Sequence, residues 1–138
     1  MPVLDSYLFF DGNCAEAMRF YERTLGAKLD TMMTYGESPD PEHCPAGSKD
    51  RIMHAHMTVD GRALMASDTP AGQPSPGMSG FSLSLSYPTA DEAKRVFDVL
   101  AEGGKVQMPV SKTFWADAFG MLVDRFGTPW MVNGGVKS

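Results

Sequence analysis

The chain has 138 residues, of which 43% are hydrophobic and 21% charged, as in ordinary water-soluble globular proteins. Its formal net charge of −5 disfavours a nucleic acid or an anionic membrane as a partner, since both require a basic face. The chain shows no signal-peptide pattern, and no apolar run reaches the roughly 20 residues of a membrane span. We therefore expect one cytoplasmic domain in which Cys14 and Cys44 are free thiols.

The first strand is predicted over residues 3–10, where the side chains alternate between two faces. Tyr7 and Phe9 fall on one face of this strand, and Leu8 and Phe10 fall on the other. One face is therefore expected to pack into the core, while the opposite face presents two aromatic rings.

A helix is predicted directly after this strand. Asn13 is the expected N-cap, and Glu16 three residues later completes a capping-box pattern. Apolar residues then recur at helical spacing until Gly26, which is typical of a helix C-terminus.

Three further strands are predicted at residues 27–35, 52–59 and 62–68. A long polar segment with three prolines, residues 36–51, separates the first two of them and indicates a functional flap or an insert. Asp60-Gly61 predicts a tight hairpin between the last two. Residues 69–79 are rich in proline and glycine and are predicted to be a linker.

The same order of elements then begins again. Residues 81–87 alternate like a strand, with Ser82, Ser84 and Ser86 on one face. Thr89 and Glu92 repeat the capping-box pattern before a second amphipathic helix. The remaining strands are predicted at residues 105–111 and in a hairpin of residues 112–133 that turns at residues 124–127.

The two predicted helices superimpose at an offset of 76 residues. The offset places Glu16 on Glu92, Ala17 on Ala93 and Arg19 on Arg95. A helix match inside a repeated order of elements indicates an internal duplication. The predicted fold is therefore α+β, with two βαβββ modules at about residues 1–68 and 80–138 in a single domain of residues 1–138.

A duplicated βαβββ unit with these boundaries resembles the vicinal oxygen chelate superfamily, which includes glyoxalases, bleomycin resistance proteins and dioxygenases. Within it, the chain looks like the PhnB-like branch. The residues that carry this resemblance are Gly12–Ala17, Tyr21–Ala27, Cys44–Gly47, Leu64–Asp68, Gly80-Phe81, Thr113–Ala116, Phe119-Gly120, Asp124–Gly127 and Trp130–Asn133. The resemblance implies curved mixed sheets, a concave ligand-binding face and a homodimer.

The resemblance also identifies four positions where metal-dependent relatives place ligands. They correspond here to Asp5, Met65, Ser82 and Met131. Thioethers and hydroxyls are poor ligands for the divalent ions of these enzymes, so no metal cofactor is expected. The alternative is a divalent ion on Asp5, or on His54 and His56, which share one strand face, with Cys44 or His43 as an added ligand.

These observations favour a metal-independent protein that binds or sequesters a small molecule in an apolar, aromatic-lined pocket. One alternative is a lyase, isomerase or dioxygenase-like enzyme with a non-standard ligand set, and another is no small-molecule function. The expected pocket-lining residues are Tyr7, Phe9, His56, Met65, Ser82, Ser84, Trp115, Phe119 and Met131.

Three further residues are candidates for sites. Cys14 lies at a predicted helix N-terminus, where the helix dipole can lower a thiol pKa, but no partner base is identifiable in the sequence, so Cys14 is interpreted as a small buried side chain. Asp124 is interpreted as a turn former, whereas Asp117 could reach a ligand.

Members of the PhnB-like branch have often carried the label of a demethylubiquinone methyltransferase. A site for a nucleoside-type methyl donor requires a glycine-rich turn between a strand and a helix. The two turns of this kind, at residues 11–13 and 88–89, have no such composition. The sequence therefore disfavours that label.

Overall fold

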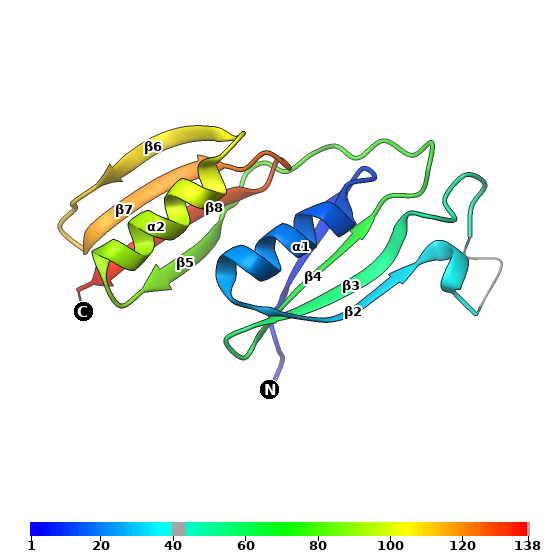
Figure 1. The fold of residues 1–138 in the computed structure, drawn as a ribbon, viewed down its shortest axis with the longest axis horizontal. Helices are drawn as coiled ribbons and strands as arrows, with labels where there is room; N and C mark the ends of the chain where they lie inside the picture. Colours follow the sequence, from blue (N-terminus) through cyan, green and yellow to red (C-terminus); the bar gives the residue numbers. More distant parts are fainter. Residues whose placement is uncertain (40–43, 138) are drawn as a thin grey trace. The chain divides into compact units, whose positions relative to one another are not determined.

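Two units, Met1–Gly77 and Met78–Ser138, make up the computed structural model, which describes residues 1–39 and 44–137 (Figure 1). Each unit contains a four-stranded mixed sheet and an α-helix, in the chain order strand, helix and three strands. The predicted α+β fold with two βαβββ modules is therefore confirmed. The division between the units falls within residues 69–79, and that both units form one domain stays a prediction.

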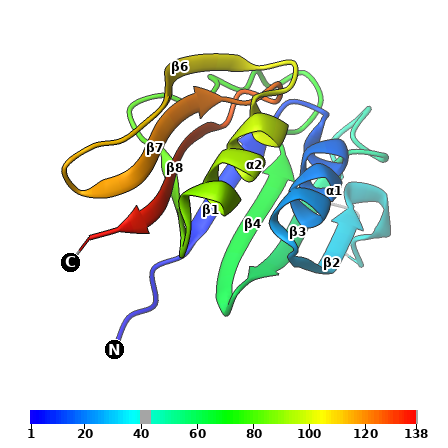
Figure 2. The same cartoon turned by 60° about the vertical axis from the view of Figure 1, so that its left-hand side comes forward.

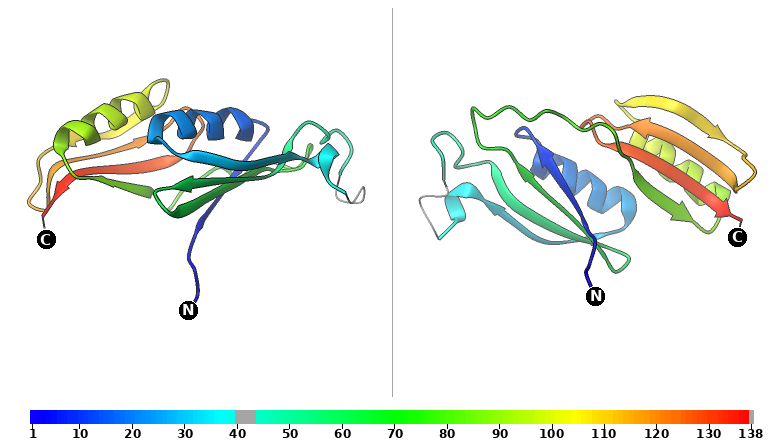
Figure 3. Two further views of the ribbon diagram at one scale, coloured as in Figure 1. Left: turned by 60° about the horizontal axis from the view of Figure 1, so that its bottom comes forward. Right: turned by 180° about the vertical axis from the view of Figure 1, so that it is seen from behind.

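The first unit is a mixed sheet with α1 on one face (Figure 3). Its strands follow the order β1-β4-β3-β2, in which β1 and β4 are parallel and the other neighbours are antiparallel. Its elements are β1 (Ser6–Phe10), α1 (Cys14–Leu25), β2 (Lys28–Thr34), the 3-10 helix η1 (Tyr35–Glu37), β3 (Ile52–Val59) and β4 (Arg62–Asp68).

Strand alternation sends every second side chain of this sheet towards α1. The buried residues on that side include Leu8, Phe10, Met57, Leu64 and Ala66, and Met18 and Tyr21 of the helix are buried as well. The face of the sheet that α1 does not cover is here called the first open face.

The second unit repeats this arrangement (Figure 2). Its elements are β5 (Leu83–Tyr87), α2 (Ala90–Ala101), β6 (Lys105–Ser111), β7 (Ala116–Val123) and β8 (Pro129–Val136). The strand order β5-β8-β7-β6 matches that of the first unit element by element. The offset of 76 residues carries the bounds of α1 onto those of α2, so the predicted internal repeat is confirmed.

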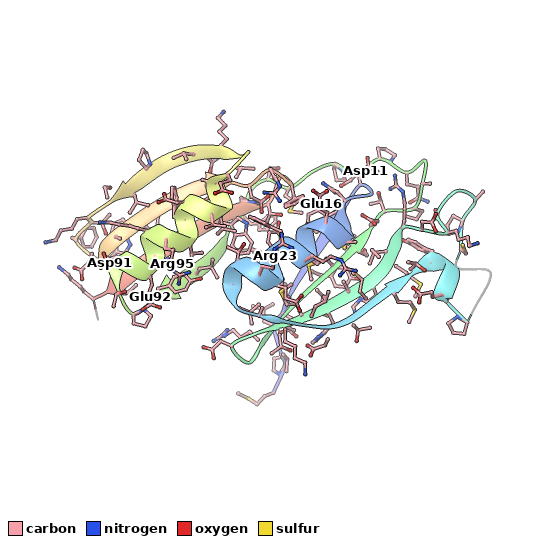
Figure 4. All side chains as sticks on the ribbon, in the orientation of Figure 1. Asp11, Glu16, Arg23, Asp91, Glu92 and Arg95 are labelled. Carbon is pink, nitrogen blue, oxygen red and sulfur yellow. The ribbon has the colours of Figure 1, made fainter. Side chains whose placement is uncertain are left out.

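Two glycines let α2 pack closely on its sheet. A Cβ atom at Gly134 of β8 would lie 2.5 Å from the carbonyl oxygen of Thr89 and 2.7 Å from the Cβ of Ala93. A Cβ atom at Gly120 of β7 would lie 2.7 Å from the ring of Phe97. Both positions therefore face the helix, and the opposite side of this sheet is here called the second open face. The charged residues Asp91 and Arg95 of α2 lie on its exposed side (Figure 4).

The two helices begin in different ways. At α2 the predicted N-cap is confirmed: Thr89 Oγ1 accepts from the backbone N–H of Glu92 at 3.2 Å, and its hydroxyl, in place of the backbone N–H of a full capping box, donates to Glu92 Oε1 at 3.2 Å. At α1 the predicted capping box is wrong, because the Asn13 side chain makes no capping hydrogen bond within the described residues. The carboxylate of Asp68 takes its place, since β4 ends beside the end of β1.

Both modules begin their first strand later than predicted. The first strand begins at Ser6 rather than at residue 3, and β5 begins at Leu83 rather than at residue 81. A strand requires a partner. In the β5–β8 register, residue 82 would lie opposite Pro129, which has no backbone N–H and is the first residue of β8. Asp5 and Ser82 therefore precede the sheets.

In the part of the chain that the structure describes, no helix is long and apolar enough to cross a membrane.

Candidate functional site

Two aromatic rings stand on the first open face. Tyr7 and Phe9 are 38% and 55% exposed, and their ring centroids are 5.2 Å apart. They lie there because Leu8 and Phe10 point the other way, into the core beneath α1. Adjacent exposed rings of this size are a feature of binding surfaces.

Tyr7 also contacts a histidine from another strand. Its hydroxyl lies 3.0 Å from His54 Nδ1, and the two rings are stacked with centroids 5.7 Å apart. The strand β4 lies between β1 and β3, so this pair spans it. Met65 of β4 is opposite Tyr7 of β1 and also opposite His56 of β3, so these three side chains lie on the first open face. His54, two residues before His56 on the same strand, lies on this face as well.

His56 is held by the carboxylate of Asp30, which no sequence motif indicates. Asp30 lies at an irregularity in β2, where the register with β3 shifts between Leu29 and Thr31. Its Oδ2 atom is 3.2 Å from His56 Nδ1 and accepts a 2.6 Å hydrogen bond from the hydroxyl of Thr58. The hydrogen bond from Thr58 and, to a smaller extent, the contact with His56 hold the pKa of the Asp30 carboxyl below its ordinary value. The carboxylate is therefore ionised near neutral pH.

The candidate metal ligands lie apart in the fold. Asp5 is exposed ahead of β1, whereas His54 and His56 contact Tyr7 and Asp30. Among residues 1–39 and 44–137, no group of three or more His, Cys, Asp or Glu side chains could hold a metal ion. His43, a further candidate, lies outside the described residues. That the protein works without a metal stays a prediction.

The second open face carries the aromatic rings of Phe119 and Trp115. The ring of Phe119 is buried and lies 5.2 Å from the half-exposed ring of Trp115, centroid to centroid. Met131 is opposite Ser84 of β5. The Ser84 hydroxyl accepts a hydrogen bond from Asn133 Nδ2 at 3.3 Å, so this serine is partly engaged within the protein.

Strand register gives the neighbours of two positions derived from the superfamily pattern. Met65 is opposite Tyr7, and Met131 is opposite Ser84. A phenol and a hydroxyl beside the two thioethers add no good ligand for a divalent ion. That Asp5, Met65, Ser82 and Met131 are the superfamily's metal positions stays a prediction.

Two of the three other candidate residues, Cys14 and Asp124, have structural roles. Cys14 is fully buried, which confirms its interpretation as a small buried side chain; burial, reinforced by the nearby charge of Asp68, raises the pKa of its thiol and leaves no sign of activation by the helix dipole. The prediction for Asp124 is confirmed, because its carboxylate accepts hydrogen bonds within the β7–β8 turn. Asp117 is exposed and lies 3.7 Å from Lys137 Nζ.

Comparison with known proteins gives the family. Residues 3–132 match the model of the Glyoxalase/Bleomycin resistance protein/Dioxygenase superfamily. The chain belongs to this superfamily, as the duplicated βαβββ fold indicates.

Particular relatives narrow this assignment to the PhnB-like branch. The chain is 44% identical to the protein YjdN of Escherichia coli, over 96% of this chain and 95% of that protein. It is 48% identical to the solved protein PA1353 of Pseudomonas aeruginosa, with a TM-score of 0.89 over 97% and 98% of the two chains. A structure titled putative 3-demethylubiquinone-9 3-methyltransferase, PhnB protein, from Bacillus cereus is 25% identical, with a TM-score of 0.80 over 96% and 99%.

Proposed function

We propose that this protein binds or sequesters a small, partly aromatic or apolar molecule without a metal ion. The observation that carries the proposal is the first open face. It presents the exposed rings of Tyr7 and Phe9 beside two imidazoles that are each held by a hydrogen-bonding partner. An apolar surface with a few fixed polar groups is the usual composition of a small-molecule site.

The residue types at the superfamily's metal positions support a metal-independent function. Met65 and Met131 offer thioethers, which are poor ligands for hard divalent ions. Tyr7 and Ser84, their strand neighbours, add only hydroxyl groups. A metal-dependent lyase, isomerase or dioxygenase would therefore need ligands from elsewhere.

The methyltransferase title of the Bacillus cereus relative has no counterpart at the first strand-to-helix turn. The backbone N–H groups of Gly12 and Cys14 donate to Asp68 Oδ1 at 2.8 and 3.0 Å. The amides that would bind an anionic or nucleoside-type group at this helix N-terminus are thus already occupied by a side chain. We do not extend that title to this chain.

The proposal is tested by elemental analysis and by equilibrium dialysis against uncharged monocyclic aromatics such as 4-nitroanisole. The expected result is saturable binding without a stoichiometric metal. Phe9→Ala should weaken binding about fivefold, which corresponds to roughly 1 kcal/mol of lost ring contact. The matched control is Phe114→Ala, which removes an 88% exposed ring from the second unit and should leave affinity unchanged.

Two outcomes would contradict the proposal. Retention of about one transition-metal ion per chain through dialysis would show that the metal-free interpretation is wrong. Equal binding by wild type and Phe9→Ala would remove the first open face as the site.

We also propose a homodimer that works in the cytoplasm, where Cys14 and Cys44 stay free thiols. Each sheet ends in edge strands, and the edge strand β6 carries the exposed side chains of Val106 and Met108. Exposed apolar edges are usually covered. Sedimentation equilibrium is expected to give twice the mass of the 15.0 kDa chain, and a monomer at all concentrations would contradict the dimer.

A further inference from the structure

The carboxylate of Asp30 fixes the hydrogen position on His56. Thr58 donates to Asp30 Oδ2, and the same oxygen lies 3.2 Å from His56 Nδ1. An ionised carboxylate only accepts hydrogen bonds, so Nδ1 must carry the hydrogen. The neutral imidazole of His56 then has its lone pair on Nε2.

The surroundings leave this lone pair available. The neighbouring strand β2 carries Lys28 and Asp30, and His54 lies on β3 itself. The other neighbour, β4, places the uncharged Met65 opposite His56, while its charged residues Arg62 and Asp68 alternate onto the other face of the sheet. Tyr7 is already paired with His54. Within the described residues, the Nε2 atom of His56 has no hydrogen-bonding partner.

Rings and a proton acceptor therefore share one surface. Tyr7 and Phe9 provide aromatic faces for a planar molecule. His56 provides a base whose orientation is set by a carboxylate, the arrangement that prepares an imidazole to take a proton. A planar ligand with an acidic hydroxyl group would use both features.

We propose that His56 accepts a proton from an acidic hydroxyl, a phenol or an enol, of the bound aromatic or planar molecule, with Asp30 as its positioning residue. The inference rests on the proposed function and names the class of its ligand. The ligand O–H bond breaks and an Nε2–H bond forms. The products are a bound phenolate or enolate and an imidazolium beside the Asp30 carboxylate, so charge and atoms balance without another reagent.

The probe for this proposal is 4-nitrophenol, because its phenolate absorbs at a longer wavelength than the neutral phenol. At a pH where the free probe is mostly neutral, the phenolate fraction of the probe bound to wild type should exceed the free fraction at least about threefold. His56→Gln should return it to the free value while the probe still binds. Asp30→Asn, which keeps an acceptor oxygen and removes the charge, should give an intermediate fraction.

The matched controls separate this inference from the proposed function. Asp117→Asn removes an exposed carboxylate from the second unit and should leave the phenolate band unchanged. The ligand 4-nitroanisole has the same ring without the acidic proton. If it binds and 4-nitrophenol does not, the inference is overturned and the proposed function stands. If neither binds, both are overturned.

An NMR measurement on the wild type without ligand tests the His56 assignment independently of whether the variants fold. Long-range proton–nitrogen NMR of the wild type should show His56 protonated at Nδ1 and unprotonated at Nε2. Asp30→Ala should increase the Nε2–H tautomer. An Nε2–H tautomer in the wild type, or a phenolate band that survives His56→Gln, would overturn the assignment.

Discussion

Replacing Asp68 by alanine is expected to lower the free energy of unfolding by about 3–5 kcal/mol. The side chain is 2% exposed and accepts hydrogen bonds from the backbone N–H groups of Gly12, Cys14 and Ile52 at 2.8, 3.0 and 2.9 Å. Alanine would leave these donors without an acceptor, and each buried unsatisfied group costs about 1–3 kcal/mol, less when several relax together. Urea unfolding followed by circular dichroism measures the loss.

The control for this change is Asp98→Ala, which removes an exposed carboxylate from α2 and should change stability by less than about 0.5 kcal/mol. Asp68→Asn should be intermediate, because an amide nitrogen would then face a backbone N–H. A loss in Asp68→Ala as small as in Asp98→Ala would show that water replaces the carboxylate at no cost.

Asp68 also shows which features of the fold cannot be predicted from the local sequence. Helical spacing and paired caps predicted both helices and their duplication, because those signals are local. The N-terminus of α1 is instead closed by Asp68, more than fifty residues away in the chain. The parallel pairing of β1 with β4 brings Phe10 and Asp68 together, and no pattern around Asn13 contains that information. The strand limits likewise depend on partners such as Pro129.

The candidate site, like the fold, has features that the sequence predicts and features that it does not. Alternation in residues 3–10 placed Tyr7 and Phe9 on one face, and the spacing of His54 and His56 placed both imidazoles on one face, as the register shows. The partners of the imidazoles could not be predicted. Asp30 reaches His56 because β2 departs from regular pairing at that residue, and such a shift has no signature in the sequence KLDTMMT.

Buried carboxylates that bind backbone amides occur in both units, each at a different turn. In the first unit Asp68 joins the ends of β1 and β4 to the start of β3. In the second unit Asp124 lies in the turn between β7 and β8. The backbone amides that they bind lie at chain turns and strand ends, so changing either should alter stability rather than the chemistry of the site.

Asp124→Ala is therefore expected to lower the free energy of unfolding by about 2–4 kcal/mol. The buried carboxylate accepts hydrogen bonds from the backbone N–H groups of Phe126 and Thr128 at 2.9 and 3.0 Å. Its second oxygen accepts the indole N–H of the buried Trp130 at 2.8 Å. An indole N–H that loses its partner inside the core retains the full cost of leaving water.

The hairpin itself offers the matched control for this experiment. Asp117→Ala removes a carboxylate of β7 that is half exposed and pairs with Lys137 at 3.7 Å. A surface pair of this kind contributes about 0–1 kcal/mol, so the expected loss is below about 0.5 kcal/mol. Asp124→Asn should be intermediate, since its amide group keeps one acceptor and turns a donor towards one N–H. Equal urea midpoints for Asp124→Ala and Asp117→Ala would contradict the role of the buried carboxylate, because burial and hydrogen bonding are what distinguish the two residues.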